Sequence, residues 1–178
     1  MGVHSMKDMP STPAKGLVFT KSWKREDPRD VLILRTASNL SDLRKGAVIG
    51  TGSKRRAFQL LKQRPDLKIV NIRGNVDTRL RKMEEQELDG IILAAAGLKR
   101  LGMQDVITQY LEPEEMISAP AQGVLALEVR EDQKELQQML DVFSDEETMN
   151  EVCAERNFLE QMGGSCHTPA GARCQKTN

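Results

Sequence analysis

Short apolar runs alternate with amphipathic stretches through the middle of the chain. The apolar runs, which we expect to be strands, lie at 30–35, 46–51, 67–72 and 89–96. Between them, residues 53–64 and 75–88 repeat apolar positions at helical spacing. Strands that are apolar on both faces and alternate with helices are typical of βαβ units, in which helices cover the faces of a sheet. The pattern therefore predicts an α/β domain that closes its own core over residues 29–117.

The segments on either side of this domain carry strand and helix patterns but no complete core. Further strands are expected at 16–23 and 124–130, and amphipathic helices at 132–142 and 145–161. At residues 3–8, in VHSMKD, a β-branched residue leads straight into a charged loop. Most domains begin instead with a polar tail that frays. The flanks are therefore expected to be pieces of something larger.

The amino-acid composition excludes several classes of function. The 178 residues contain 26 Lys and Arg against 26 Asp and Glu, so the formal net charge is zero, and only 3% are aromatic. A general nucleic-acid binder or a basic membrane-surface protein needs an excess of positive charge, and base stacking needs aromatic rings. No apolar run approaches the roughly 18 residues of a membrane span, and no signal-peptide core follows the first residue. We expect neither nucleic acid nor membrane as a partner.

Positive charge gathers at the turn after the strand at 46–51, where residues 50–56 read GTGSKRR. A strand end, a glycine turn and a helix start bring free backbone N–H groups and the positive end of the helix dipole together, which favours an anion. Thr51 and Ser53 can cap the helix or donate to the anion. Arg55 and Arg56 add two guanidinium groups suited to carboxylate or phosphate.

The next strand-to-helix turn, IRGNVDTR at 72–79, repeats this plan. Arg73 ends the strand, Gly74 turns, Asn75 is expected to cap the helix, and Arg79 lies about one turn inside it. Neighbouring parallel strands end at one edge of a sheet, where ligands of open α/β folds bind. The two turns are therefore expected to direct four arginines at one crevice, although ordinary solvated helix starts would have the same pattern. Neither turn has the spacing of a Walker loop.

The loop after the first strand offers a carboxylate. Asp8 follows Lys7 there, and it is either a catalytic carboxylate or a salt-bridged surface group.

The three cysteines all lie near the C-terminus. Three is an odd number and fits a reducing cytoplasm better than a disulfide framework. Cys166 lies in GGSCH, a flexible loop where a thiolate is accessible, and both a covalent role and an inert thiol are open. Cys166, His167 and Cys174 lack the paired spacing of a zinc site, so no metal is expected. Cys153 occupies a helical position near apolar residues and is expected to be a buried, inert thiol.

Several longer motifs extend over nearly the whole chain. They are VHSMKD, REDPRD, GTGSKRRAFQL, RPDLKI, RGNVDTRL, LAAAGLKRLG, PAQGVLALE and GGSCHTPAGA. In this order and spacing the chain resembles the porphobilinogen deaminase family, also called hydroxymethylbilane synthase. The resemblance implies a cytoplasmic transferase of haem biosynthesis, which joins four porphobilinogen molecules head to tail and releases ammonia each time. It also implies a dipyrromethane cofactor bound covalently to one cysteine.

The resemblance assigns roles by motif. Asp8 becomes the catalytic carboxylate and Cys166 the attachment cysteine. Cys174 is the fallback, because Ser165 stands between Cys166 and the two glycines that usually precede this cysteine directly. The cofactor-binding residues would be Lys7, Ser5, Thr51, Ser53, Arg55, Arg56, Arg73 and Gly74. The substrate-binding residues would be Arg79, Arg100, Gln122 and Gly123. No metal is implied.

The resemblance also implies a domain plan in which both ends of the family protein are missing. Residues 1–28 would be the C-terminal part of domain 1, 29–117 a periplasmic-binding-protein-like domain 2, 118–137 a return segment to domain 1, and 138–178 the start of a small α+β domain 3. On this plan the family protein is a monomer, whereas the fragment is expected to be inactive and to self-associate. The alternative function is a non-catalytic anion-binding α/β module, since domain 2 has the architecture of solute-binding proteins.

Overall fold

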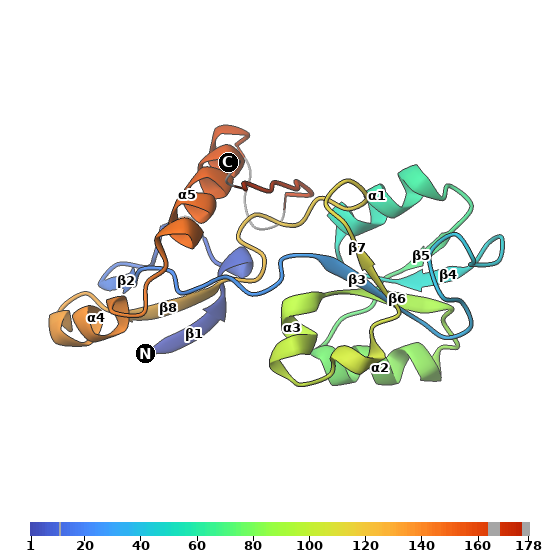
Figure 1. Ribbon diagram of the computed structural model, residues 1–178, viewed down its shortest axis with the longest axis horizontal. Coiled ribbons are helices and arrows are strands. Elements are labelled where there is room, and N and C mark those ends of the chain that lie inside the picture. The colour runs from blue at the N-terminus through green and yellow to red at the C-terminus, as the bar shows by residue number, and fades with distance from the viewer. Residues whose placement is uncertain (11, 164–167, 176–178) are drawn as a thin grey trace. The chain divides into compact units, whose positions relative to one another are not determined.

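A computed structural model describes residues 1–10, 12–163 and 168–175. The chain divides into two compact units, one of residues 29–117 (unit 2) and one that combines residues 1–28 with 118–178 (unit 1) (Figure 1). Residues 138–175 thus fall in unit 1. The finer division into four domain segments stays a prediction.

Unit 2 is built on one five-stranded sheet with the order β5-β4-β6-β3-β7. Its strands are β3 (Asp30–Leu34), β4 (Val48–Gly50), β5 (Lys68–Val70), β6 (Gly90–Ala94) and β7 (Gln109–Leu111). As predicted, β4 is parallel to both β5 and β6. However, β3 is antiparallel to β6 and β7, so the sheet is mixed. The connection 35–47 contains no helix, and a parallel connection within a sheet usually needs one.

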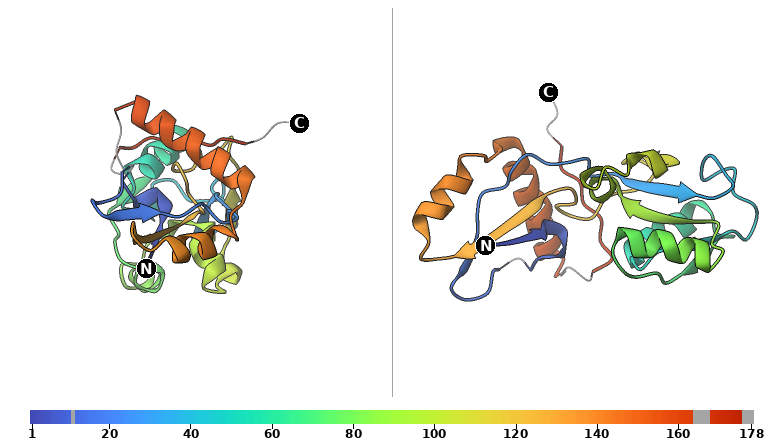
Figure 2. Two further views of the ribbon diagram at one scale, coloured as in Figure 1. Left: turned by 90° about the vertical axis from the view of Figure 1, so that its left-hand side faces the viewer. Right: turned by 90° about the horizontal axis from the view of Figure 1, so that it is seen from below.

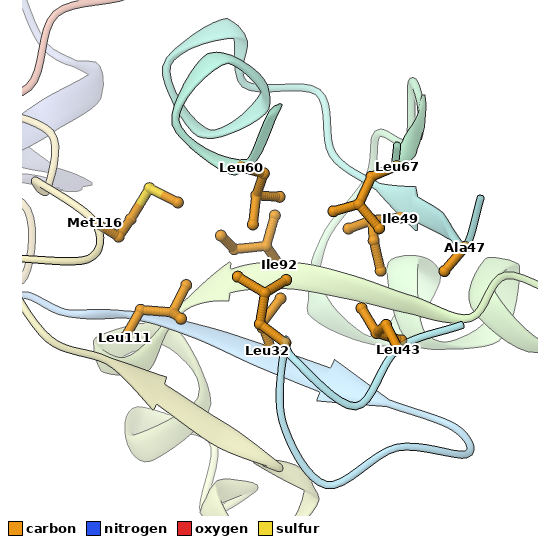
Figure 3. Packing of buried hydrophobic residues seen from close by; sticks show 10 residues of the cluster. Leu32, Leu43, Ala47, Ile49, Leu60, Leu67, Ile92, Leu111 and Met116 are labelled. Atoms are coloured by element: carbon orange, nitrogen blue, oxygen red, sulfur yellow. The ribbon is translucent and has the colours of Figure 1, made fainter. Parts of the chain in front are cut away.

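Helices cover both faces of this sheet. They are α1 (Lys54–Gln63), α2 (Val76–Glu85) and α3 (Ala95–Arg100), with the short 3₁₀ turn η2 (Gln104–Val106). On one face Leu60 of α1 packs over Leu32 and Ile92, as Figure 3 shows. On the other face Val31 and Leu93 pack with residues of α2 and α3. Successive residues of β3 and β6 thus belong to opposite cores, because strand side chains alternate between faces. Because both faces of β3 and β6 are buried, these strands appear in the sequence as continuous apolar runs.

Unit 1 contains a three-stranded antiparallel sheet with the order β1-β8-β2. Its strands are β1 (Gly2–Ser5), β2 (Leu17–Phe19) and β8 (Leu125–Arg130). The 3₁₀ turn η1 (Met6–Asp8) follows β1 directly. The helices α4 (Lys134–Asp141) and α5 (Glu146–Gln161) lie close to the predicted bounds, and Figure 2 shows α5 as the longest helix of the chain. Met6, Ala126 and Val152 belong to the small core of this unit.

The prediction that Cys153 is buried is wrong. Its side chain is exposed, because α5 buries the face that carries Thr148, Val152 and Glu155. Cys153 follows Val152 and is rotated from it by about 100° around the helix axis. The side-chain amide of Asn157 lies 3.5 Å from the Cys153 sulfur on the exposed side.

Candidate functional site

The turn between β4 and α1 is built from hydrogen bonds within GTGSKRR. The Thr51 N–H donates to the Val70 carbonyl at 2.9 Å, which ties the turn to β5. The Thr51 hydroxyl accepts from the Ser53 N–H at 3.1 Å, and Ser53 caps α1 by accepting from the Arg56 N–H. A side chain at Gly52 would bring its Cβ within 2.9 Å of the Ile72 carbonyl. Glycine therefore permits the close approach of the two strand-to-helix turns.

Beneath this turn lies a buried cluster of one carboxylate and two guanidinium groups. Arg55 Nη1 lies 2.7 Å from Asp30 Oδ2, and Arg56 Nη2 lies 2.7 Å from Asp30 Oδ1. Arg55 also donates to the Ile117 carbonyl at 2.6 Å, and Arg56 to the Ile92 carbonyl at 3.3 Å. The three charged side chains are almost wholly inaccessible to solvent. With two cations and one anion, the cluster keeps one net positive charge under the start of α1.

The charged groups of this cluster shift one another's pKa values. Burial alone would raise the pKa of Asp30, but the charges and hydrogen bonds of Arg56 and Arg55 outweigh it and lower the pKa to about 2. Burial lowers the pKa of Arg55, and the charge of Asp30 opposes that shift. Asp30 is therefore ionised at neutral pH.

The turn between β5 and α2 is capped as predicted, by Asn75, whose side chain accepts from the Thr78 N–H at 2.9 Å. Gly74 has φ = +129°, and a Cβ there would lie 2.6 Å from the Thr78 side chain, so the turn requires glycine. Arg79 reaches back along the helix and donates to the Gly74 carbonyl at 2.7 Å. Arg73 does not end the strand as predicted, because β5 ends at Val70; Arg73 is exposed in the connection between β5 and α2.

The structure thus brings most of the predicted arginines of unit 2 to one edge of the sheet, at the carboxyl ends of the parallel strands β4 and β5. Their environments differ. Arg55 and Arg56 are buried against Asp30, whereas Arg73 is exposed and Arg79 is partly exposed. Arg100 is exposed at the last residue of α3.

The predicted site residues of unit 1 gather around η1. Lys7 Nζ donates to Gln122 Oε1 at 3.2 Å, and Gln122 Nε2 donates to the Pro28 carbonyl at 2.7 Å. Gln122 is completely buried, while Asp8 is exposed in the same turn as Lys7. Ser5 precedes the turn without capping it through its side chain.

The second residue of the pair Gln122–Gly123 is required for its backbone shape. Gly123 has φ = +92°, and a Cβ there would lie 2.3 Å from the Glu26 carbonyl oxygen. The Glu26 N–H in turn donates to the Gly123 carbonyl at 3.1 Å. The loop that presents Gln122 is therefore pressed against the segment before β3.

Sequence reasoning missed the polar groups that hold this loop. Arg25 makes a two-pronged contact with Glu155, at 2.8 and 3.0 Å, and its Nε donates to the Gln122 carbonyl at 2.8 Å. Glu155 also accepts from the Ala121 N–H at 2.7 Å and the Cys174 N–H at 2.9 Å. The available signal was that Glu155 falls on the same helical face as Thr148 and Val152, where a carboxylate needs a buried partner.

Some expectations fall on residues that the structure does not describe. Cys166, with Ser165 and His167, lies outside the described residues. Cys174 is partly exposed. Among the residues that are described, no group of three or more His, Cys, Asp or Glu side chains could hold a metal ion. Within those same residues no helix has both the length and the apolar character needed to cross a membrane.

A mixed α/β domain with two helix N-termini and arginines at one sheet edge places the chain in a class of α/β proteins whose strand ends suit an anionic ligand. Residues 1–138 match the family model described as "Porphobilinogen deaminase, dipyromethane cofactor binding domain". The chain therefore belongs to the porphobilinogen deaminase family, as its motifs predicted, and the matching model is that of the family's dipyrromethane cofactor binding domain.

Individual relatives agree with the family model. The chain is 58% identical to the porphobilinogen deaminase of Lachnospira eligens over 98% of its own length and 60% of that protein. It is 55% identical to that of Clostridioides difficile over 98% of its length and 58% of that protein. The chain thus spans about three fifths of these curated relatives. Among solved structures, a putative methionine-binding lipoprotein from Bacillus subtilis matches with a TM-score of 0.49 and 11% identity, covering 90% of this chain and 70% of that one. The sheet and the covering helices of unit 2 themselves confirm the α/β class predicted from the sequence.

Proposed function

We propose that these residues form part of a hydroxymethylbilane synthase, which condenses four porphobilinogen molecules head to tail with release of ammonia. The observation that carries the proposal is the sheet edge where two helix N-termini and the predicted arginines meet. Pyrroles that bear acetate and propionate groups form a growing polyanion. An edge with exposed guanidinium groups, and a buried net positive charge behind it, suits that polyanion.

The same edge fits the dipyrromethane cofactor, because its donors match carboxylates in kind. Thr51, Ser53 and the exposed Arg73 would hold the cofactor carboxylates, and the N-terminus of α1 would add backbone donors. Arg55 and Arg56 would act from below, through their charge. When bound, the cofactor supplies the primer pyrrole to which the first substrate is joined, with Cys166 as its point of attachment.

Asp8 would serve the chemical step. The substrate's aminomethyl C–N bond breaks and ammonia leaves, which creates a cationic azafulvene. A new C–C bond then forms between that carbon and the free ring position of the growing chain, and the ring position loses its proton. A carboxylate beside these atoms stabilises the cation and can accept the proton. Lys7, held by the buried Gln122, fixes the neighbouring position in the turn.

The test is made in the full-length protein that contains these residues. Asp8→Asn keeps the shape of the side chain but removes its charge, so we expect turnover of porphobilinogen to fall by a factor of about 100 or more while the cofactor remains attached. Asp105→Asn is the matched control, since Asp105 is an exposed aspartate in η2. Normal turnover by the Asp8→Asn protein would exclude the proposed role.

An intact mass separates the enzyme from the non-catalytic anion-binding module. An excess equal to one dipyrromethane supports the enzyme, and a bare mass supports the module. We expect the excess to vanish in Cys166→Ser and to persist in Cys153→Ser and Cys174→Ser. Loss of the excess in Cys174→Ser alone would move the attachment to Cys174.

A further inference from the structure

One arginine of α5 makes its contacts in the first residues of the chain, far from it in sequence. Arg156 Nη1 donates to the Met6 carbonyl at 3.0 Å. Its Nη2 lies 3.3 Å from the Met9 carbonyl and also donates to the Pro10 carbonyl. These carbonyls lie on both sides of Lys7 and Asp8. A single guanidinium group therefore holds the backbone before and after the turn that carries both residues.

The chemistry of a short helical turn explains why a guanidinium group suits this place. The turn η1 makes one backbone bond of its own, from the Met9 N–H to the Met6 carbonyl at 3.2 Å. Carbonyls at the end of a helical turn point outward and carry partial negative charge, and the Met6 carbonyl keeps a second lone pair beside its bond to Met9. Arginine presents five N–H donors in a rigid planar fork, so that it can bind several such carbonyls at once.

The helix that carries Arg156 is itself fixed in place. The preceding residue, Glu155, is 1% exposed and binds Arg25 and the Ala121 N–H. Adjacent helical residues point about 100° apart, so Glu155 faces the loop that presents Gln122 while Arg156 faces η1. Gln122 also accepts from Lys7. Both connections from α5 therefore converge on the turn of Lys7 and Asp8.

We propose that Arg156 is a positioning residue that holds the Lys7–Asp8 turn in its working conformation. The inference rests on the proposed function, because it takes Asp8 as the catalytic carboxylate. Arg156 acts through the backbone of the turn. Its removal should therefore slow the chemical step without weakening the binding of substrate or cofactor.

The geometric part is tested by hydrogen exchange in the full-length protein that contains these residues. In Arg156→Gln we expect the amides of Met6 and Met9 to exchange at least about tenfold faster than in the wild type, because the turn opens more often once its carbonyls lose the fork. Arg156→Lys should give an intermediate rate, since its ammonium group cannot bridge three carbonyls at once. Arg130→Gln is the control, because Arg130 is an exposed arginine of the same unit that pairs with Asp132, two residues further along the chain. Unchanged exchange at Met6 and Met9 in Arg156→Gln would overturn the proposal.

The catalytic part is tested in the full-length protein with the same three variants. We expect Arg156→Gln to lower kcat about 10- to 100-fold, the loss that a small misplacement of a catalytic group can cause, with KM within about twofold and cofactor content unchanged. Faster exchange with an unchanged kcat would also overturn the proposal, because the turn would then not need this support. If Arg156→Gln does not fold, Arg156→Lys carries both measurements, with the same two overturning results. Failure of the proposed function would be recognised by a different result, because the wild-type protein itself would then not consume porphobilinogen.

Discussion

Asp30 shows how a single buried residue can govern the charge of a site. It lies at the start of β3 and binds Arg55 and Arg56, whose positions in the sequence predicted two ligand-facing arginines. Because both guanidinium groups are buried with it, they act on a ligand at the sheet edge through their electrostatic field and not through direct hydrogen bonds. At Arg55, truncation to Ala is therefore expected to weaken the fold as well as chain assembly.

Replacing Asp30 with Asn should destabilise unit 2. Two buried guanidinium groups would lose their counter-charge, and breaking a buried ion pair typically costs about 3–5 kcal/mol. The pKa of Asp30 is lowered from 3.8 to about 2. Its contribution to the free energy of unfolding is thus fully present above about pH 4 and is lost as the pH falls through about 2.

Denaturant titrations at pH 7, and at several values between pH 4 and 2, measure both effects. The wild type should lose stability across the acid window, and Asp30→Asn should lack the part of that slope that belongs to Asp30. Asp105→Asn serves as the exposed control here too. Equal stability of Asp30→Asn and wild type at pH 7 would contradict this account of the cluster.

Arg73 offers the cleaner test of anion binding, because it is exposed in the connection between β5 and α2. In the full-length protein, Arg73→Ala should reduce chain assembly about 10- to 100-fold, since each charge-assisted hydrogen bond contributes roughly 1.5–3 kcal/mol. The fold should stay intact. Arg73→Lys should also be impaired, because lysine cannot reproduce the two-pronged contact with a carboxylate. Arg81→Ala, on α2, removes an arginine paired with Glu85, and it should leave assembly kinetics near those of the wild type.

At the scale of elements, the candidate site residues are placed by the connections at the ends of strands and not by the middles of strands. The turns before α1 and α2 each depend on a glycine, since a Cβ at Gly52 would meet the Ile72 carbonyl and one at Gly74 the Thr78 side chain. The two helices begin with side-chain caps from Ser53 and Asn75. In unit 1 the corresponding element is the loop with Gly123, which α5 supports through Glu155. These connections place the site residues on backbone that has little freedom to move.

Substitutions at two glycines of unit 1 can distinguish the cost of backbone strain from the cost of a steric clash. Gly16 and Gly123 both have positive φ, at 81° and 92°, but only Gly123 has backbone atoms where a Cβ would be placed. Gly16→Ala should therefore cost about 1–2 kcal/mol of stability, from the left-handed conformation alone. Gly123→Ala should cost clearly more and should loosen Gln122, because the Glu26 carbonyl must move. Thermal unfolding of both variants makes the comparison, and equal losses would show that the contact with Glu26 is easily relieved.

At the scale of the whole molecule, the two units have separate cores. The buried clusters around Leu32 and around Val31 consist of residues of unit 2, and the cluster around Met6 consists of residues of unit 1. In the described part of unit 1, the sheet has only three strands, with β1 and β2 at its edges. Exposed strand edges favour pairing with another chain.

We expect the 178-residue chain alone to lack deaminase activity and covalent cofactor and to self-associate through unit 1, while unit 2 stays native-like. The chain spans 60% of its relative from Lachnospira eligens, so contacts made by the rest of such a protein would be missing. Sedimentation at increasing concentration, with an assay for porphobilinogen consumption, tests this expectation. Turnover by this chain, or a monomer at all concentrations with protected amides along β1 and β2, would contradict it.

Local spacing in the sequence was enough to predict the α/β alternation, the two capped turns at the parallel strand ends, and the pair Arg73 and Arg79 beside them. These features depend on residues within one or two helical turns of each other. The spacing of apolar positions and the capping residue of a helix can both be recognised in such short stretches. The motifs likewise identified the family. The short strand β7 was missed because its three residues lie in a mostly polar segment and are defined by pairing with β3.

Only the tertiary structure decided which polar groups distant in the sequence contact each other. Asp30 and Arg56 are 26 positions apart, and Arg156 and Met6 are 150 apart, so no local pattern links them. The buried pair of Asp30 and Arg56 forms because burying a charge without a partner costs far more than burying a paired one. Which segments fold against each other decided that Arg55 and Arg56 are buried with Asp30, and that Arg156 of α5 contacts the backbone on both sides of Lys7 and Asp8.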